Sequence, residues 1–219
     1  MEKYLILDFD STISKVEGLD ELAKKALEGD AEKDRKVKEI IELTNLGMEG
    51  AISFSESLER RIQLVSADKR IISEAAQHIL DNISDSVIRN ADFFRENAGK
   101  IYIISGGFVD LIVPTAEKLG IARENILANE FVFDENDCVC GVNKDNFMSQ
   151  EGGKIKQINE LELDQKAVMV GDGWTDCQTK ECASVEKFIA FTENVRRDKV
   201  VRHADAVAND FEEVIMHLI

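Results

Sequence analysis

The feature that most constrains the fold is a set of short apolar runs, each of which ends abruptly in polar residues. The runs and their endings are Tyr4 to Leu7 before Asp8, Lys100 to Ile104 before Ser105, and Ala167 to Val170 before Gly171 and Asp172. Runs of this length are typical of strands buried on both faces. Helical patterns separate them, so we predict an α/β fold with a doubly wound, mostly parallel, Rossmann-like sheet.

The polar endings predict a site at one edge of that sheet. Parallel strands share a carboxyl edge, and ligands bind there at a topological switch point. In the first strand Asp10 follows Asp8 by two residues, and residues at i and i+2 of an extended chain point the same way. Taken alone, this pair also fits a solvated acidic turn. The similar endings at Ser105 and Asp172 favour a shared site.

A helical insertion separates the first strand from the rest of the predicted sheet. Between residues 18 and 77 apolar residues recur at helical spacing in four segments, and Asp68 is a suitable N-cap for the last. We therefore predict a helical cap, residues 15–78, inserted into a catalytic core of residues 1–14 and 79–219. Ile126 to Phe133 and Cys138 to Val142 flank a polar turn, which predicts a β-hairpin.

Composition narrows the class of function. The chain has 43 acidic and 27 basic residues, a net charge of -16, which argues against general binding to nucleic acid or anionic membranes. No apolar run approaches the length of a membrane span, and the N-terminus lacks a signal-peptide pattern. The four cysteines lack zinc-site spacing, so we expect free thiols and a cytoplasmic protein.

The clustered carboxylates predict a divalent-cation site. Mg²⁺ prefers octahedral oxygen ligation, usually by one or two carboxylates, water and a substrate phosphate. Asp8, Asp172 and a backbone carbonyl near Asp10 would supply the protein ligands, with Asp176 as an anchor behind them. Without a cation, converging carboxylates would repel one another.

The same residues suit phosphoryl transfer. An aspartate can accept a phosphoryl group, so Asp8 would attack phosphorus while Asp10 protonates the leaving oxygen and later deprotonates water. Lys154 would neutralise charge on the transferring group, although a lone lysine is more often a surface residue. Phosphate oxygens would be bound by Ser105 and the amides of Gly106 and Gly107, which we expect at a helix N-terminus after the second strand.

Four motifs in chain order resemble those of the haloacid dehalogenase superfamily of aspartate-nucleophile phosphatases. They are Asp8-Phe9-Asp10-Ser11-Thr12, Ser105-Gly106-Gly107-Phe108, Gly153-Lys154 and Gly171-Asp172-Gly173-Trp174-Thr175-Asp176. The segment Glu17 to Ala23, the Met48 turn and the segment Phe54 to Arg61 resemble the helical cap of the phosphoserine phosphatase family. The resemblance covers nearly the whole chain and is weakest between Asp68 and Ala98.

The resemblance implies an Mg²⁺-dependent hydrolase of serine biosynthesis that converts O-phospho-L-serine to L-serine and phosphate through an aspartyl-phosphate intermediate. The catalytic residues that it implies are Asp8, Asp10, Ser105 and Lys154, and the metal-holding ones are Asp8, Asp10 and Asp172, with Asp176 behind them. It also implies that Glu17 binds the serine ammonium and Arg61 its carboxylate. The other implied substrate-side positions are Met48, Ser105, Gly106, Gly107, Lys154, Thr175 and Arg197.

Three departures from the family pattern keep other substrates open. Glu49 stands where the family usually has glycine, Trp174 replaces a small residue in the metal loop, and Thr192-Glu193 stand where Gly-Gly is common. The partner would be a small phosphorylated metabolite, with phosphoethanolamine, phosphothreonine or transfer to an alcohol as alternatives. A receiver-like phosphoaspartate signalling module needs neither Asp10 nor a cap. Monomer and homodimer both remain open.

Overall fold

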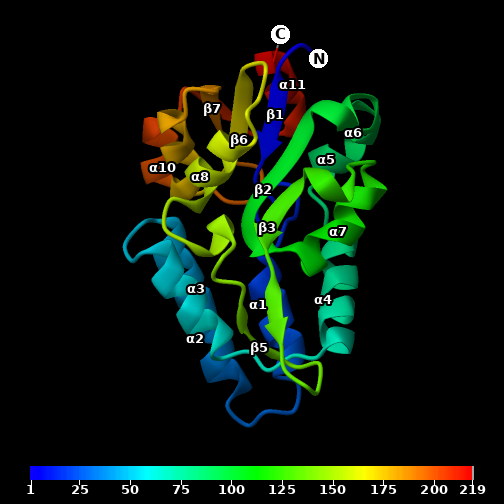
Figure 1. Ribbon diagram of the computed structural model, residues 1–219, viewed down its shortest axis with the longest axis vertical. Coiled ribbons are helices and arrows are strands. Elements are labelled where there is room, and N and C mark those ends of the chain that lie inside the picture. The colour runs from blue at the N-terminus through cyan, green and yellow to red at the C-terminus, as the bar shows by residue number, and fades with distance from the viewer. Residues whose placement is uncertain (219) are drawn as a thin grey trace.

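The computed structural model describes residues 1–218 and shows a parallel sheet with helices on both faces (Figure 1). Within these residues the main sheet has six strands in the order β3-β2-β1-β6-β7-β8, and each adjacent pair is parallel. The strands are β1 (Tyr4–Leu7), β2 (Ile101–Phe108), β3 (Ile126–Asn129), β6 (Ala167–Gly171), β7 (Val185–Phe191) and β8 (Ala206–Ala208). The predicted doubly wound α/β fold is confirmed.

Helices on both faces explain why the strands are mostly apolar. One face packs against α5 (Asp85–Arg89), α6 (Ala91–Asn97), α7 (Val109–Lys118) and α11 (Phe211–Leu218), and the other against α8 (Gly153–Glu160), α9 (Trp174–Gln178) and α10 (Asp198–His203). In β1, Leu5 and Leu7 belong to the first core and Ile6 to the second, and all three are fully buried. Alternate residues therefore enter opposite cores.

The predicted cap region lies beyond the carboxyl ends of the strands (Figure 1). Its helices are α1 (Gly18–Ala26), α2 (Lys33–Met48), α3 (Phe54–Ile62) and α4 (Lys69–Asp81). The side chain of Asp68 accepts a hydrogen bond from the backbone N–H of Ile71, which confirms the predicted N-cap of α4. Helix α4 packs against both α1 and α7. We keep the name cap for residues 15–78, which leaves the last residues of α4, 79–81, on the core side of the boundary.

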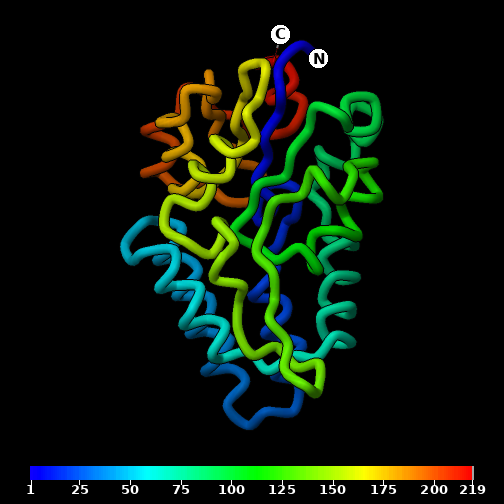
Figure 2. The backbone as a smooth tube through the Cα atoms, in the orientation of Figure 1, coloured from blue at the N-terminus to red at the C-terminus, as the bar shows by residue number. Residues whose placement is uncertain are grey.

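The two connections between core and cap lie side by side. Ser14 and Ile83 form an antiparallel bridge, and Ser84 Oγ donates to the backbone O of Thr12 at 2.7 Å. Asn194 donates from Nδ2 to the backbone O of Ser11 and to Ser84 Oγ, so it ties both connections to the core. Figure 2 shows the chain termini at the end of the molecule remote from the cap.

An antiparallel hairpin extends from the sheet toward the cap. It consists of β4 (Phe131–Phe133) and β5 (Val139–Val142). Its predicted first arm began at Ile126, but Ile126–Asn129 forms β3 and pairs with β2 in the main sheet. Phe131 stacks on Phe108 with ring centres 3.7 Å apart, which anchors the hairpin. Short 3₁₀ turns cover Ala98–Lys100, Arg123–Asn125, Phe147–Ser149 and Thr179–Glu181.

Two expectations from composition concern the cysteines and the membrane. All four cysteines are free thiols: Cys177 and Cys182 are buried, and Cys140 is exposed on β5. Among the helices in residues 1–218, none combines the length and the apolar character that crossing a bilayer requires.

Candidate active site

The polar endings of the strands converge at the switch point of the sheet. Strand β1 lies between β2 and β6, with Leu7 beside both Ile103 and Val170. The backbone N–H of Asp8 donates to the O of Val170 at 2.9 Å, so Asp8 and Asp172 leave neighbouring strands together. One carboxylate oxygen each from Asp8, Asp172 and Asp176 lies within 4.8 Å of the other two. The structure thus brings these three predicted residues into one cluster.

Lys154 is buried among these carboxylates rather than lying on the surface. Its Nζ is 3.0 Å from Asp8 Oδ1 and also pairs with Asp176. Burial lowers the pKa of Lys154, but the charges of Asp176 and Asp8 raise it by more, so the net pKa lies above its ordinary value. Lys154 is therefore a fixed ammonium group within the acidic cluster.

A glycine pair places Lys154 at the start of α8. Gly152 has φ +68, in the left-handed region that favours glycine. A Cβ added to Gly153 would lie 2.3 Å from the backbone O of Phe147, so no larger residue fits without moving the backbone. The sequence Gly152-Gly153 therefore lets α8 begin close against the preceding turn, with Lys154 directed into the site.

The two oxygens of Asp172 have different surroundings. Oδ2 accepts a hydrogen bond from Arg197 Nε at 2.9 Å, whereas Oδ1 is buried and has no hydrogen-bond partner within residues 1–218. Burial, followed by the charge of Glu17, raises the pKa of Asp172 well above its ordinary value. A buried carboxylate oxygen without a partner is costly. A cation at Oδ1 would remove that cost.

The donor set fits a hard divalent cation. The clustered donors are carboxylate oxygens, the ligands that Mg²⁺ and Ca²⁺ prefer. The carboxylate of Asp176 already binds Lys154 and accepts from the backbone N–H of Gly173 at 2.9 Å. Burial, with the charge of Asp8 next, raises the pKa of Asp176 to about 7. Asp172 therefore offers an oxygen that lacks a hydrogen-bond partner, and Asp8 lies beside it.

Asp10 lies between this cluster and the first cap helix. Ser11 has φ +54, and this left-handed residue turns the chain after Asp10. Oδ1 of Asp10 accepts from the backbone N–H of Gly18, the first residue of α1, at 2.8 Å. Burial, then the charges of Glu17 and Asp8, raises the pKa of Asp10 well above its ordinary value. The protonated form that a general acid needs is therefore favoured.

Ser105, Gly106 and Gly107 lie inside β2 rather than at a helix N-terminus. The strand continues to Phe108, with a register shift against β3 after Ile104, and α7 begins at Val109. Ser105 Oγ accepts from the backbone N–H of Gly107 at 3.0 Å. The expectation that a helix starts at this motif is wrong, because β2 keeps pairing with β3 as far as Asn129.

The cap closes over this strand end through one aromatic side chain. A Cβ added to Gly106 would lie 2.6 Å from the ring of Phe54, the first residue of α3. Phe54, Gly106, Lys154 and the predicted residue Thr175 line one cavity. The backbone O of Gly106 accepts from Asn129 Nδ2 at 2.8 Å, which fixes the strand end beneath the ring.

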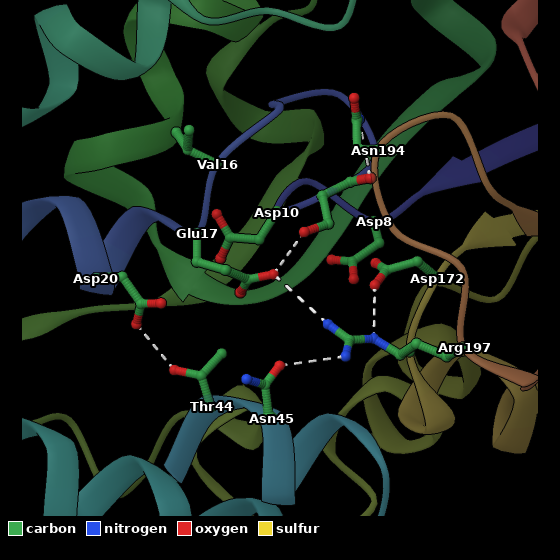
Figure 3. Close-up of polar contacts among 12 residues, drawn as sticks. Asp8, Asp10, Val16, Glu17, Asp20, Thr44, Asn45, Asp172, Asn194 and Arg197 are labelled. Atoms are coloured by element: carbon green, nitrogen blue, oxygen red, sulfur yellow. Dashed lines mark hydrogen bonds and ion pairs between the residues drawn. The ribbon is translucent and has the colours of Figure 1, made fainter. Parts of the chain in front are cut away.

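Of the predicted cap residues, Arg61 is buried and Glu17 is half-buried. Glu17 accepts from Ser11 Oγ at 2.6 Å and lies 3.9 Å from Arg197 (Figure 3). Burial raises the pKa of Glu17 and lowers the pKa of Arg61. Arg61 donates to Thr44 Oγ1 at 3.2 Å and to the backbone O of Ser57. Both charged groups thus lie on the side of the cap that faces the core.

Several residues of the site have no motif in the sequence. Asp20 is buried and accepts from Thr44 Oγ1 at 2.9 Å, which places a second carboxylate beside the Arg61 network (Figure 3). Asn45 Oδ1 accepts from Arg197. Each of these residues looks like a solvent-facing member of an amphipathic helix.

Comparisons with known proteins agree with this geometry. The sequence profile of the haloacid dehalogenase-like hydrolases matches residues 5–180, and the chain belongs to this family. Phosphoserine phosphatases of Homo sapiens and Bos taurus are each 33% identical to it over 218 and 215 residues. Those alignments cover 96% and 95% of this chain and 91% and 89% of the relatives.

A solved structure extends the similarity to three dimensions. A crystal structure of a phosphoserine phosphohydrolase-like protein from Francisella tularensis subsp. tularensis SCHU S4 has a TM-score of 0.88 to this chain at 32% identity. The match covers 99% of this chain and 100% of that one. Within the family, the chain is therefore similar to the phosphoserine phosphatases, and both levels of the predicted resemblance are confirmed.

Proposed function

We propose that the protein is an Mg²⁺-dependent phosphomonoesterase that hydrolyses O-phospho-L-serine to L-serine and phosphate. The observation that carries this proposal is a single site to which both the core and the cap contribute charged groups. On the core side are Asp8, Asp172 and Lys154; on the cap side are Glu17, which is half-buried, and Arg61, which is buried. Similarity to phosphoserine phosphatases along nearly the full length of both chains supports the choice of substrate.

Asp8 is the proposed nucleophile. Its carboxylate oxygen bonds to phosphorus as the bond from phosphorus to the serine oxygen breaks, and Asp10 gives that oxygen its proton. Asp10 then takes a proton from water, whose oxygen attacks the aspartyl phosphate and releases phosphate, restoring both aspartates. The raised pKa of Asp10 supports its part in this cycle, because the residue must carry a proton before the first step.

Lys154 and Ser105 would bind the oxygens of the transferring phosphoryl group, and Lys154 is already fixed beside Asp8. The metal would be held by Asp8, Asp172 and the backbone carbonyl of Asp10. When bound, Mg²⁺ supplies positive charge beside the phosphoryl oxygens. The partnerless Oδ1 of Asp172 supports this assignment.

The cap would select the amino-acid part of the substrate. A carboxylate matches the guanidinium of Arg61, and an ammonium matches Glu17. Phosphoethanolamine lacks the carboxylate, which argues against it. Among the three departures, Glu49 is exposed, and Glu193 accepts from the backbone N–H of Ser86 at the junction of core and cap. Neither adds a contact to the cluster of Asp8 and Asp172.

A phosphate-release screen with Mg²⁺ tests the proposal. The substrates are both phosphoserine enantiomers, phosphothreonine, phosphoethanolamine and p-nitrophenyl phosphate. We expect the highest kcat/KM for O-phospho-L-serine, loss of turnover with a chelator, and recovery when Mg²⁺ is returned. A higher kcat/KM for phosphoethanolamine would overturn the substrate assignment, and full activity in the chelator would overturn the metal.

A further inference from the structure

The C-terminal end of α2 meets the core at a contact that phosphoryl transfer does not use. Lys199, in α10, donates from Nζ to the backbone O of Glu49 at 2.9 Å, and Glu49 directly follows the last residue of α2. The same Nζ lies 4.0 Å from the centre of the Trp174 ring. One cation of the core therefore lies between an aromatic face of the core and a helix end of the cap.

Both neighbours of Lys199 Nζ attract positive charge. The last carbonyls of a helix lack intrahelical partners and form the negative end of its dipole. Helix α2 has no basic residue in its own last turn, so Lys199 supplies that charge from the core. The face of an indole ring also attracts a cation. The ring is itself supported by His203, whose edge-to-face contact has a centre distance of 5.2 Å.

Gly50 allows the two surfaces to approach this closely. Its φ is +69, in the left-handed region. A Cβ at this position would lie 2.9 Å from Trp174 Cδ1 and 3.3 Å from Lys199 Nζ. The chain therefore turns out of α2 directly against the indole and the ammonium group.

The contact adjoins residues that hold the acidic cluster. Met48 packs on Gly173, where an added Cβ would lie 3.2 Å from Met48 Sδ. Asn45 accepts from Arg197 Nη1 at 3.4 Å, and Arg197 Nε holds Asp172 (Figure 3). These contacts hold the end of α2 beside the loop that carries Asp172.

We propose that Lys199 and Trp174 form a latch that holds the cap closed over Asp8 and Asp172. They are positioning residues, because their contacts run to the end of α2 rather than to the reacting groups. The contact is made by Lys199, Trp174 and the turn at Glu49-Gly50. Of the residues in it, Trp174 and Glu49 are departures from the family pattern. The effect of the latch on catalysis rests on the proposed function, whereas its effect on cap opening does not.

Hydrogen exchange on the full chain tests the latch without substrate. Lys199→Met removes the charge and the donor but keeps an apolar stem, and Lys199→Arg keeps both. The matched control is Lys144→Met, because Lys144 also bridges to the cap, through an exposed ion pair with Glu59 at 2.9 Å. We expect amide exchange across residues 45–52 to be about tenfold faster in Lys199→Met, from the usual strength of cation–π and helix-end interactions. Lys199→Arg and Lys144→Met should match the wild type.

Trp174→Leu, which keeps bulk without a ring face, should reproduce the faster exchange. An unchanged rate in Lys199→Met, an equal rise in Lys144→Met, or a uniform rise across all helices would each overturn the latch.

Kinetics separate a latch from a general loss of folded enzyme. With the closed state weakened, KM for phosphoserine should rise severalfold in Lys199→Met while kcat is maintained. A drop in kcat at unchanged KM would instead indicate fewer active molecules and overturn the positioning role. If the wild type does not hydrolyse phosphoserine, the proposed function fails, but the exchange experiment still decides the latch.

Discussion

On the core side of the site each charged residue follows a strand or lies in the first turn of a helix packed on the sheet, whereas on the cap side Glu17 directly precedes α1 and Arg61 lies in α3. The backbone of Asp8 is held by the sheet itself through Val170. Arg61 is held through Thr44, and Glu17 through Ser11, by side-chain hydrogen bonds. The proposed reacting groups are therefore held by the sheet, whereas the proposed substrate-binding groups of the cap are held by side-chain hydrogen bonds. Core substitutions should lower turnover on every substrate, and cap substitutions should change the preference between substrates.

The largest expected effect is at Asp8. Asp8→Asn removes the attacking oxygen, so turnover and acid-stable phosphoenzyme should be lost for phosphoserine and p-nitrophenyl phosphate alike. Phosphate release and trapping of the phosphoenzyme measure this, with circular dichroism to check the fold. Retained phosphoenzyme in the folded variant would refute the nucleophile.

Asp10→Asn should be next in severity. We expect kcat for phosphoserine to fall at least about a hundredfold, the usual contribution of general acid–base catalysis. The first step with p-nitrophenyl phosphate should suffer less, because p-nitrophenolate leaves without a proton. Burst kinetics on both substrates measure this difference. Near-normal turnover of phosphoserine would count against the role of Asp10.

Arg61→Ala tests the cap side alone. Loss of a charge-assisted contact to the substrate carboxylate should lower kcat/KM for phosphoserine by about thirtyfold. Activity on p-nitrophenyl phosphate, which has no carboxylate, should change little. Arg60→Ala is the matched control, since Arg60 is the preceding residue of α3 and forms an exposed pair with Glu56. Equal losses on both substrates would mean that Arg61 does not bind a carboxylate.

The smallest predicted effect lies where the two regions touch. Gly106→Ala places a methyl group against the ring of Phe54, so we expect the cap to be displaced and kcat/KM for phosphoserine to fall a few-fold. Phe54→Leu removes the atoms that the methyl group would meet. In a double-mutant cycle the second substitution should restore part of the loss. Purely additive losses would show that the ring and Gly106 are not coupled.

The core side could be predicted from the sequence because it is built from local patterns. An apolar run that stops at Asp8 or Asp172 marks both a buried strand and the edge where it ends, and Gly153 marks the start of the helix that carries Lys154. The family resemblance then implied roles that spacing alone left open. The predicted start of the hairpin was wrong because it depends on a non-local contact. Ile126 belongs to the main sheet because it pairs with Ile103 of β2, which the local sequence around Ile126 does not reveal.

The cap side was harder to predict from the sequence, again because its contacts are not local. Asp20, Thr44 and Asn45 lie on helices with ordinary amphipathic spacing, and nothing local distinguishes a polar residue that faces solvent from one that contacts another helix or the core. Lys199 and Trp174 are 25 positions apart, and no helical or strand repeat in the sequence connects them. Their contact exists only after the end of α2 has docked, so it had to be observed in three dimensions.

Trp174 has one more consequence, since it is the only tryptophan in the chain. Indole emission responds to nearby charge and to water, and this indole lies under an ammonium group at the boundary between core and cap. The unmodified protein therefore carries its own optical reporter at the proposed latch between core and cap. Rapid-mixing fluorescence could follow each closure in real time, without a dye, a label or an engineered cysteine.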